Sequence, residues 1–522
     1  MAPQRVKVLA RDLGLWHLPT GPGDARSVDR VSALETHISV LLFMGDRVYK
    51  LRKKVATPFL DFSTRELRLA DCHREVELNR RLAPDVYLGV LDVVDESGAP
   101  VDHVVVMRRL PDGRRLSTMI ADGEVDDSHI ARIARQLAAF HERAERSAEI
   151  DRAGSTDHLT RLWTTNLDET RAYRGRWLDP DLHDRIGHAA LAYLDGRHPL
   201  FSQRVAQGRI VDGHGDLLAQ DIFCLDDGPR ILDCIEFDSM FRWGDILYDT
   251  SFLAMDLEHL DRPDLARRFL DTYREFTAET HPLSLEHWYV AYRALVRAKI
   301  ACLRAAGGEV SAPDEAASYL AQSARHLECA EVRMVLVGGL PGTGKSTVAQ
   351  GLADRFGWDL LRTDEVRREL WGREHAEHAY SRPFEGRYDA QGTAEVYTEL
   401  LRRAQLALEM GDSVVLDASW LDSAHRDAAR SLATQAHATL DELCCVVDMR
   451  TAGMRIRARA ALGHDPSDAT PEVLAALAQR ATVPWAGGHV VDTSRRPADV
   501  VDQAIAAVRR GLAAPWSASC EA

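Results

Sequence analysis

Short apolar runs alternate with amphipathic helical segments in the C-terminal third of the chain. The runs are Met334–Val337, Val414–Leu416, Cys444–Val447 and Val490–Val491, and each has a helical segment before or after it. Such alternation is typical of a mostly parallel, doubly wound sheet with helices on its faces. We therefore predict an α/β domain, and we place it at residues 331–511.

The N-terminal part has a different pattern, in which two hairpin-like regions are separated by helical segments. The hairpins are expected at residues 37–53 and 222–235. This mixture predicts an α+β domain over residues 1–325, with a small strand-rich lobe followed by a helix-rich lobe. The clearest break lies near residues 306–330, where AAGGEVSAPDEAA reads as a loop before a short helix.

Composition and charge narrow the class of protein. The 522 residues are 45% hydrophobic and 28% charged, as in a soluble globular protein, and no apolar run approaches the roughly 20 residues that span a bilayer. We expect a cytoplasmic protein, because the N-terminus carries charges where a signal peptide would be apolar. None of the eight cysteines forms a C-x-x-C pair, which predicts reduced thiols. The net charge of −15 makes nucleic acid an unlikely partner. The oligomeric state cannot be read from the sequence.

Residues 339–346, GLPGTGKS, carry the complete G-x-x-x-x-G-K-[ST] pattern between a predicted strand and a predicted helix. Gly342 and Gly344 let backbone amides curl around phosphates, Lys345 reaches the β- and γ-phosphates, and the Ser346 hydroxyl ligates Mg²⁺. The pattern therefore predicts a site for ATP and Mg²⁺. The expected nucleotide-binding residues are Gly339, Leu340, Pro341, Gly342, Thr343, Gly344, Lys345, Ser346 and Thr347.

Charged residues beyond this loop are candidates for phosphoryl transfer. Asp364 follows the second strand and can accept a proton from an attacking hydroxyl, and Arg367 lies one helical turn further on. Asp417 ends the apolar strand of SVVLDASW, where it could hold the Mg²⁺ shell. The arginine-rich segment 450–459 offers cations for the migrating phosphoryl group, with Arg455 and Arg459 the better candidates and a solvated helix face the alternative.

The segments GLPGTGKST, TDEVRREL, VVLDASW, the arginine segment and DPSDA together resemble the small P-loop kinases related to polynucleotide, gluconate and zeta-toxin kinases. The resemblance implies that Asp364 is the catalytic base, that Arg367 binds the acceptor, and that a lid carries arginines like those at 455–459. The segment VVDTSRRP is similar to the last strand and loop of that family, where Thr493 is a weak candidate for lining the adenine.

A second set of residues also suits phosphoryl transfer. In HGDLLAQD and ILDCIEFD, Asp216 lies in a loop and Asp233 ends a strand, so one carboxylate can accept a proton while the other holds Mg²⁺. Lys50 is expected on the second strand of the first hairpin, where it can reach the α- and β-phosphates. Glu75, on the following helix, can pair with it. Taken singly, a surface lysine or a solvated glutamate is commoner, but the chain order favours a site.

Residues 30–305 resemble the aminoglycoside-phosphotransferase-like, protein-kinase-like fold. The resemblance implies that Asp216 is the catalytic base, Asp233 a metal ligand and His214 a brace of the loop, and that Asp245 buttresses the lobe. The chain departs from the family at Asp221, where asparagine is usual. Asp221 can still ligate Mg²⁺, but it adds a negative charge beside the phosphates.

Several functional hypotheses remain open at this point. The first is an ATP- and Mg²⁺-dependent phosphotransferase with two kinase-like modules, which phosphorylates a hydroxyl of a small metabolite. The second confines chemistry to the P-loop half and leaves the N-terminal half as a regulatory nucleotide-binding module. A nucleic-acid end kinase and a nucleotide-driven binding protein are further alternatives, the former disfavoured by the acidic charge.

Overall fold

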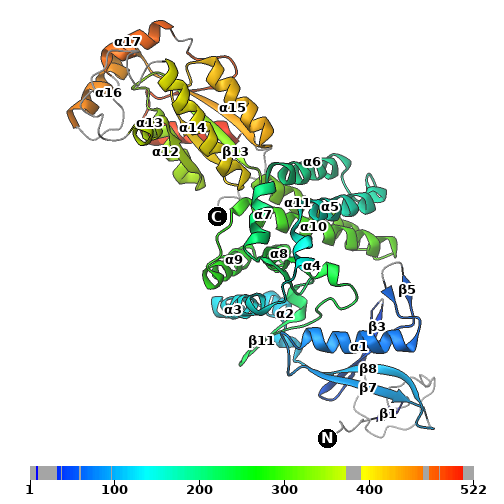
Figure 1. The fold of residues 1–522 in the computed structure, drawn as a ribbon. Helices are drawn as coiled ribbons and strands as arrows, with labels where there is room; N and C mark the ends of the chain where they lie inside the picture. The colour runs from blue at the N-terminus through cyan, green and yellow to red at the C-terminus, as the bar shows by residue number, and fades with distance from the viewer. Residues whose placement is uncertain are drawn as a thin grey trace. The chain divides into compact units, whose positions relative to one another are not determined.

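The computed structural model describes residues 7–9, 32–36, 38–57, 60–95, 97–371, 390–462, 470–480 and 483–509. Contacts divide the chain into two compact units (Figure 1), each described here by itself. The first comprises Met1–Ser155 and Arg204–Thr280, and the second comprises Thr156–Gln203 and His281–Ala522. The domain boundaries expected at residues 325 and 331 remain predictions.

The first unit begins with a six-stranded sheet in the order β1-β7-β8-β4-β3-β2, antiparallel except where β1 meets β7. β3 and β4 form the first expected hairpin. Helix α1, which the Thr64 side chain caps by accepting from Leu67 N at 3.2 Å, packs against β7 and β8. Elements in this part of the unit are β1 (Lys7–Leu9), β2 (Ser32–Glu35), β3 (Ser39–Met44), β4 (Arg47–Arg52), β5 (Ala56–Thr57), β6 (Leu60–Asp61), α1 (Arg65–Asn79), β7 (Tyr87–Val94) and β8 (Pro100–Arg108).

The rest of the first unit is mainly helical and contains the second expected hairpin, in which β10 and β11 pair antiparallel. β9 pairs antiparallel with β12, which leads directly into the buried helix α8. The prediction of a strand-rich lobe followed by a helix-rich lobe is confirmed. Its elements are α2 (Leu116–Ala121), α3 (Asp127–Arg143), α4 (Ala148–Asp151), β9 (Ile210–Asp212), β10 (Ile222–Leu225), β11 (Gly228–Ile231), β12 (Trp243–Asp245), α8 (Ile246–His259) and α9 (Pro263–Thr277).

The second unit begins with long helices around an aromatic cluster. Trp288 of α10 lies 5.5 Å from Trp163, 5.7 Å from Tyr193 and 5.4 Å from Phe201, measured between ring centroids. The loop expected after residue 306 is shorter than predicted, because α11 already begins at Ala312, with a proline in its first turn where the missing N–H costs nothing. The helices are α5 (Thr156–Thr170), α6 (Pro180–Gly196), α7 (His198–Ala206), α10 (Leu283–Ala306) and α11 (Ala312–Cys329).

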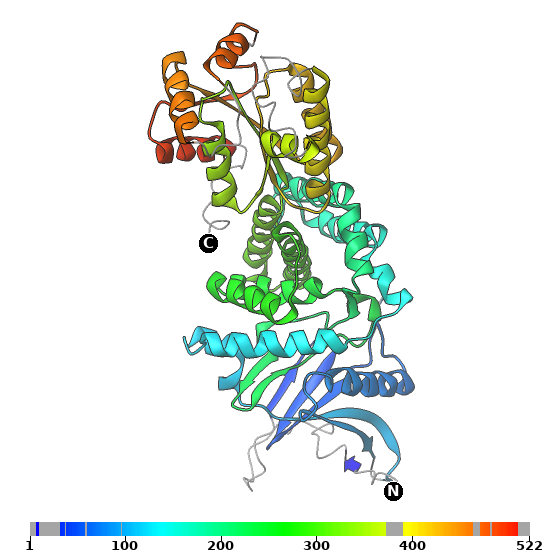
Figure 2. The ribbon, with the colours of Figure 1, turned by 60° about the vertical axis from the view of Figure 1, so that its left-hand side comes forward.

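The remainder of the second unit is the predicted doubly wound domain. Its five strands are all parallel, in the order β14-β15-β13-β16-β17. Helices α12 and α18 cover one face, and α14 packs on the other, as Figure 2 shows. The elements are β13 (Arg333–Gly338), α12 (Lys345–Phe356), β14 (Asp359–Arg362), α13 (Thr363–Trp371), α14 (Ala390–Glu409), β15 (Val414–Asp417), α15 (Ser423–Gln435), β16 (Thr439–Val446), α16 (Met449–Leu462), α17 (Pro471–Arg480), β17 (His489–Asp492) and α18 (Pro497–Arg509).

Hydropathy and cysteine chemistry complete the picture of the fold. Across the described part of the chain, no helix combines the length and the apolar character that crossing a membrane requires. Six cysteines are buried and free, as expected: Cys72, Cys224, Cys234, Cys302, Cys444 and Cys445. Cys329, in contrast, is disulfide-bonded, so the prediction of reduced thiols is wrong for that residue.

The aromatic cluster predicts which side chains of the second unit can be shortened only at a large cost in the free energy of unfolding. Trp288 is 1% exposed, so replacing it with alanine should lower the free energy of unfolding by about 3–5 kcal/mol, measured by urea denaturation. Leu303→Ala on the same helix, at 52% exposure, is the matched control and should cost less than about 0.5 kcal/mol. Equal losses in both variants would contradict the packing described here.

Candidate functional site

The P-loop connects the central strand β13 to helix α12 and requires glycine at specific positions. Gly342 and Gly344 have φ angles of 77° and 84°, in the left-handed region. A Cβ atom at Gly339 would lie 2.4 Å from the carbonyl oxygen of Cys445, and one at Gly342 would lie 2.5 Å from that of Ala452. Both the backbone conformation and the available space therefore exclude side chains, which keeps the loop narrow enough to wrap a phosphate.

Two side chains of the loop contact its own backbone. Lys345 Nζ lies over the loop and donates to the carbonyl oxygen of Leu340 at 3.2 Å. The Thr343 hydroxyl is turned inward and donates to the same oxygen at 2.7 Å, whereas Pro341 is half-buried. Thr347 is exposed on the first turn of α12. The loop thus presents its backbone and one lysine, rather than its hydroxyl at position 343, to a ligand.

Ser346 and Asp417 come together beside the loop. The Ser346 hydroxyl donates to the Asp417 carboxylate, which is buried at the end of β15. Burial raises the pKa of Asp417, although Lys345 and Ser346 act in the opposite direction. Hydroxyl and carboxylate oxygens are ligands that Mg²⁺ prefers, so this pair fits the metal that accompanies a nucleotide.

Asp364 and Arg367 form the pair that their spacing predicts. Both lie in the first turns of α13, and Arg367 Nη1 donates to Asp364 Oδ1 at 2.8 Å. Arg362, which the sequence analysis did not single out, precedes them on β14 with its Nε 3.9 Å from Asp417 Oδ2. Asp364 therefore has one arginine partner and Asp417 has another, and a carboxylate beside an arginine is suited to an acceptor hydroxyl that lies next to phosphate charge.

Tyr397 of α14 braces the turn that follows Asp417, and sequence reasoning missed it. Its hydroxyl lies 3.0 Å from Ser419 Oγ and accepts from Trp420 N at 3.1 Å. The carbonyl oxygen of Ser419 in turn accepts from Gly339 N at 3.0 Å. Tyr397 therefore fixes both the turn after Asp417 and the start of the P-loop. In the sequence, this role is indicated only by an aromatic residue on the inward face of a helix that covers the sheet.

In the arginine-rich helix α16, Arg455 is the residue that reaches the P-loop. Arg455 Nη1 and Nη2 donate to Oγ1 and the carbonyl oxygen of Thr493 at 3.3 and 2.7 Å, and a Cβ at Gly344 would lie 3.5 Å from Nη1. Thr493 thus lies against the phosphate loop. Arg459 is half-buried one turn further along α16. The DPSDA segment lies outside the described residues.

The expected lysine–glutamate pair of the first unit is present. Lys50 Nζ lies 2.7 Å from Glu75 Oε1 and 2.9 Å from Asp233 Oδ1. Burial lowers the pKa of Lys50, but Asp233 and Glu75 outweigh this and hold it well above its ordinary value. The ammonium group is therefore fixed in its charged form between helix α1 and the segment after β11, where a phosphate can approach it.

Three carboxylates of the first unit influence one another electrostatically. Asp233 has a φ angle of 64°, which is unusual for a residue other than glycine, and Lys50 lowers its pKa. Burial raises the pKa of Asp221 well above its ordinary value, and the nearby Asp233 and Asp216 raise it further. The charges of Asp216 and Asp233 are therefore close enough to Asp221 to act on its titration. This all-oxygen donor set fits Mg²⁺, whose charge would offset the mutual repulsion.

Asp249 holds the loop that carries Asp216, and sequence reasoning missed it. Its carboxylate accepts from His214 N at 2.5 Å and from Gly215 N at 2.8 Å, and lies 3.2 Å from His141 Nε2. His214 braces the loop as expected, with Nε2 3.1 Å from the carbonyl oxygen of Leu232. Burial lowers the pKa of His214 to about 4, so the ring is neutral at physiological pH.

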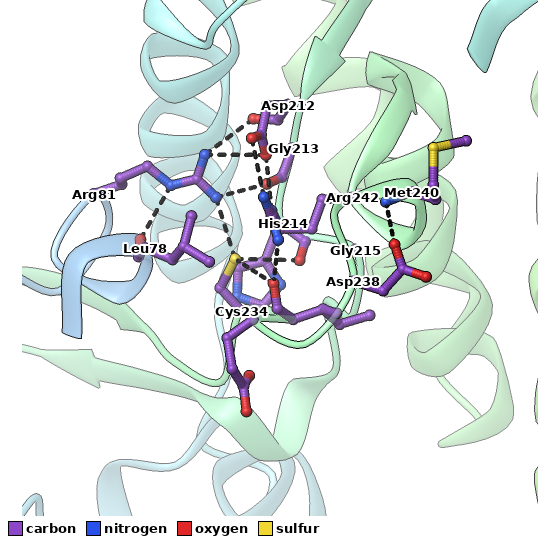
Figure 3. Close-up of polar contacts among 12 residues, drawn as sticks. Leu78, Arg81, Asp212, Gly213, His214, Gly215, Cys234, Asp238, Met240 and Arg242 are labelled. Atoms are coloured by element: carbon purple, nitrogen blue, oxygen red, sulfur yellow. Dashed lines mark hydrogen bonds and ion pairs between the residues drawn. The ribbon is translucent and has the colours of Figure 1, made fainter. Parts of the chain in front are cut away.

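Asp245 and two arginines fix the strands that flank this loop. Asp245 caps α8 and forms a buried pair with Arg204 at 2.7 Å, which agrees with a buttressing role. Arg242 donates to both oxygens of Asp212 at 2.9 and 3.1 Å, and Arg81 donates to Gly213 O at 2.8 Å; these contacts are dashed lines in Figure 3. The backbone on both sides of His214 is therefore held by charged groups.

A buried arginine couples Lys50 to the rest of this site. Arg52 lies two residues after Lys50 on β4, is 2% exposed, and contacts three carboxylates. Its guanidinium lies 2.7 Å from Asp71 and from Glu75 Oε2, and it also donates to Glu236. These carboxylates are close enough to suit a metal ion, but the arginine is their partner here. Glu75 thus divides its two oxygens between Lys50 and Arg52.

Comparisons with known proteins agree with a two-module chain. The model of the phosphotransferase enzyme family matches residues 45–285, and that of the AAA domain matches residues 334–484. The uncharacterized proteins Rv2004c of Mycobacterium tuberculosis and Mb2027c of Mycobacterium bovis are each 43% identical over 464 residues, which is 89% of this chain and 92% of theirs.

Solved structures resemble the two parts separately. A choline/ethanolamine kinase family protein from Mesorhizobium loti is similar over 59% of this chain and 92% of its own, at 15% identity and a TM-score of 0.36. A gluconokinase from Sinorhizobium meliloti is similar over 34% of this chain and 92% of its own, at 21% identity and a TM-score of 0.26. Because these scores are low, the assignment rests on the family matches and the mycobacterial relatives.

The P-loop geometry predicts the effect of a single methyl group. Gly342→Ala would need a left-handed backbone and would place Cβ against the Ala452 carbonyl, so ATP affinity should fall at least about tenfold in a fluorescent-nucleotide titration. The control is Gly453→Ala on α16, where nothing lies within 4 Å of the added atom and affinity should not change. Unchanged affinity in Gly342→Ala would contradict the constraint.

Arg52→Met removes the cation that three buried carboxylates share, so Asp71 and Glu236 lose the cation they contact, whereas Glu75 keeps Lys50. The free energy of unfolding should fall by about 3–5 kcal/mol, because the charges stay buried and uncompensated. Arg47→Met, on the same strand with a side chain 39% exposed, is the control and should cost under about 1 kcal/mol. Adding Glu236→Gln to Arg52→Met should recover part of the loss, and a double variant no more stable than the single one would contradict this account.

Proposed function

We propose that this chain uses ATP and Mg²⁺ to phosphorylate a hydroxyl of a small metabolite in the cytoplasm. The chain belongs to the family of these mycobacterial proteins, and its matches to the phosphotransferase enzyme family and to the AAA domain support a phosphotransferase with two kinase-like modules. The observation that carries the proposal is the P-loop, with its lysine and the adjoining Ser346–Asp417 and Asp364–Arg367 pairs. These supply the phosphate cradle, the metal ligands and the base that such a transfer needs.

In the P-loop half, the acceptor hydroxyl attacks the γ-phosphorus in line, and the bond to the β–γ bridging oxygen breaks. Asp364 takes the hydroxyl proton, so the products are ADP and the phosphorylated acceptor. Arg367 orients both Asp364 and the acceptor, whereas Lys345 neutralises the β- and γ-phosphates. Ser346 and Asp417 would hold Mg²⁺, which supplies further positive charge to the phosphates.

The lid side of the P-loop half is assigned to α16. Arg455, bound to Thr493 beside the loop, is placed to meet the nucleotide phosphates. We assign Arg459, one turn along the same helix, to the migrating phosphoryl group and its leaving oxygen. Arginine suits both roles because its guanidinium stays charged and bonds phosphate in a bidentate manner.

The N-terminal half would use the same chemistry with a different set of residues. Asp216 would accept the proton of the acceptor hydroxyl, whereas Asp233 and Asp221 would hold Mg²⁺. Lys50, aligned by Glu75, would bind the α- and β-phosphates. The acceptor of either half is a small hydroxylated molecule, because the acidic net charge disfavours nucleic acid.

One observation favours a second candidate, in which only the P-loop half transfers phosphate and the N-terminal half binds nucleotide as a regulator. Asp221 adds a third carboxylate near Asp216 and Asp233. Repulsion from these two carboxylates raises the pKa of Asp221 further than burial alone does. An additional negative charge next to the phosphates weakens transition-state stabilisation. The two candidates differ in whether Asp216 is needed for turnover.

The test measures transfer of labelled γ-phosphate from ATP to a library of hydroxylated metabolites. Asp364→Asn and Asp216→Asn should each lower the kcat of their own reaction by about 10²–10⁴-fold, because each removes a general base without changing size. Lys345→Met should also abolish transfer by the P-loop half. Matched controls are Glu365→Gln on α13 and Asp226→Asn, whose side chain is 99% exposed in the β10–β11 turn.

The outcomes separate the candidates. Loss of transfer only in Asp364→Asn and Lys345→Met would assign the chemistry to the P-loop half alone. ATP hydrolysis without any phosphorylated acceptor would contradict the kinase proposal and favour a nucleotide-driven binding protein. Unchanged turnover in all three variants would mean that both assigned centres are wrong.

A further inference from the structure

A cavity lies inside the second unit, away from the P-loop. It has a volume of about 300 Å³, opens to the surface, and is lined by α6, the end of α11, the connection from α11 to β13, and the segment between α15 and β16. This volume is at the lower end of the range found for small-molecule sites. Its apolar wall includes Ile186, Ala192, Leu327 and Val332.

The cavity is also lined by a buried arginine. Arg197 follows α6 directly and is 1% exposed. Its Nη1 donates to the carbonyl oxygens of Ala436 and His437 at 2.7 and 3.2 Å, and its guanidinium lies 5.1 Å from the ring centre of Tyr193. Its Nε has no hydrogen-bond partner in the described part of the chain. The contacts made by this cation are therefore backbone dipoles and an aromatic ring.

Other arginines that are equally buried in this chain face carboxylates. Arg204 pairs with Asp245 and Glu279, whereas Arg333 pairs with Asp441 and Glu331. Among the described residues, no carboxylate lies within ion-pair distance of Arg197, and burial lowers its pKa to about 10. The end of helix α15 supplies only about half a unit of negative charge to offset it. A buried guanidinium without a full counter-charge is costly.

The acidic residues that line the cavity already have other cationic partners. Glu328 lies 3.3 Å from Arg185 at the rim, and Glu331 pairs with Arg333. Arg197 is thus the cation of this cavity that lacks a carboxylate. A bound anion would supply the missing negative charge, and the apolar wall would contact the remainder of the molecule.

We propose that this cavity is a binding site for a small monocarboxylate with a short apolar body, whose carboxylate pairs with Arg197. The site is separate from both sets of phosphotransfer residues. It includes Ala330 and Val332 in the covalent connection to β13, so a ligand bound there contacts both the helices and the P-loop domain of the second unit.

Equilibrium dialysis of labelled acetate, butyrate and hexanoate against the full chain tests the proposal. Ionic strength is held constant with sodium chloride, and excess MgADP fills the nucleotide sites. One saturable site per chain is expected, with affinity rising about fourfold for each added CH₂ group as the apolar wall is covered. Labelled inorganic phosphate, the other simple anion, should bind more weakly than butyrate.

Two variants and a control identify the site. Arg197→Met removes the charge, and Ala192→Leu fills the cavity while keeping the charge, so each should weaken butyrate binding at least tenfold. Arg185→Met at the rim is the control and should bind butyrate within about twofold of the unchanged chain, because its guanidinium already faces Glu328. Ala192→Leu keeps the test valid if Arg197→Met fails to fold.

The outcomes that would overturn the proposal are specific. Absence of saturable carboxylate binding would show that Arg197 serves only to cap helix α15. Binding that persists in both Arg197→Met and Ala192→Leu would place the carboxylate elsewhere. Phosphate binding without carboxylate binding would exclude the proposed class of ligand.

Discussion

The register of the parallel sheet is the constraint on which the P-loop site depends. Asp417 is paired with Val337 on one side and with Arg362 on the other, so three strands end at the same level. The P-loop leaves from one of these strands and Asp364 follows another, whereas Asp417 ends the third. A shift of one residue in any strand would turn these side chains to the opposite face of the sheet and separate them.

In the first unit, buried ion pairs rather than strand register hold the candidate site residues together. Lys50 and Arg52 lie on the same face of β4 and share Glu75, so helix α1 is joined to the strand by two ionic contacts. Asp233 and Glu236 attach the segment after β11 to the same cations. If one of these ionic contacts is broken, a buried charge is left without its counter-charge. The cluster therefore favours a single arrangement of the strand, the helix and the segment after β11.

Much of this could be predicted from the sequence because the relevant signals are local. The P-loop pattern fixes the strand–loop–helix geometry, and the three-residue spacing of Asp364 and Arg367 places them on one helix face. The Lys50–Glu75 contact was inferred from chain order, and the structure has it at 2.7 Å. The same reasoning predicted the parallel strands of the C-terminal domain and the β3–β4 and β10–β11 hairpins, but it missed the antiparallel pair β7–β8 of the N-terminal sheet. The catalytic and metal-binding roles of these residues remain predictions.

The missed residues depend on contacts between distant segments. Asp249 is 2% exposed in the largely buried helix α8, and only the tertiary fold brings the His214 and Gly215 amides to it. For the same reason, the roles of Tyr397 and Arg197 can be recognised only once the fold shows which residues they contact. A charged residue inside an apolar helix is a signal that sequence reading can use, because an isolated buried carboxylate would be too costly. The identity of its partner still needs the fold.

The contacts of Ser284 bear on how the chain can be divided. Ser284 Oγ donates to the carbonyl oxygen of Gly411 at 2.6 Å, and a Cβ atom at Gly196 would lie only 2.4 Å from the Ala436 carbonyl oxygen. Helices within the phosphotransferase-family match, and just after it, are thus part of the same compact body as the P-loop domain. If the two family matches were expressed as separate polypeptides, the contacts between these helices and the P-loop domain would be lost. Each fragment would then expose to solvent a surface that is buried in the full chain.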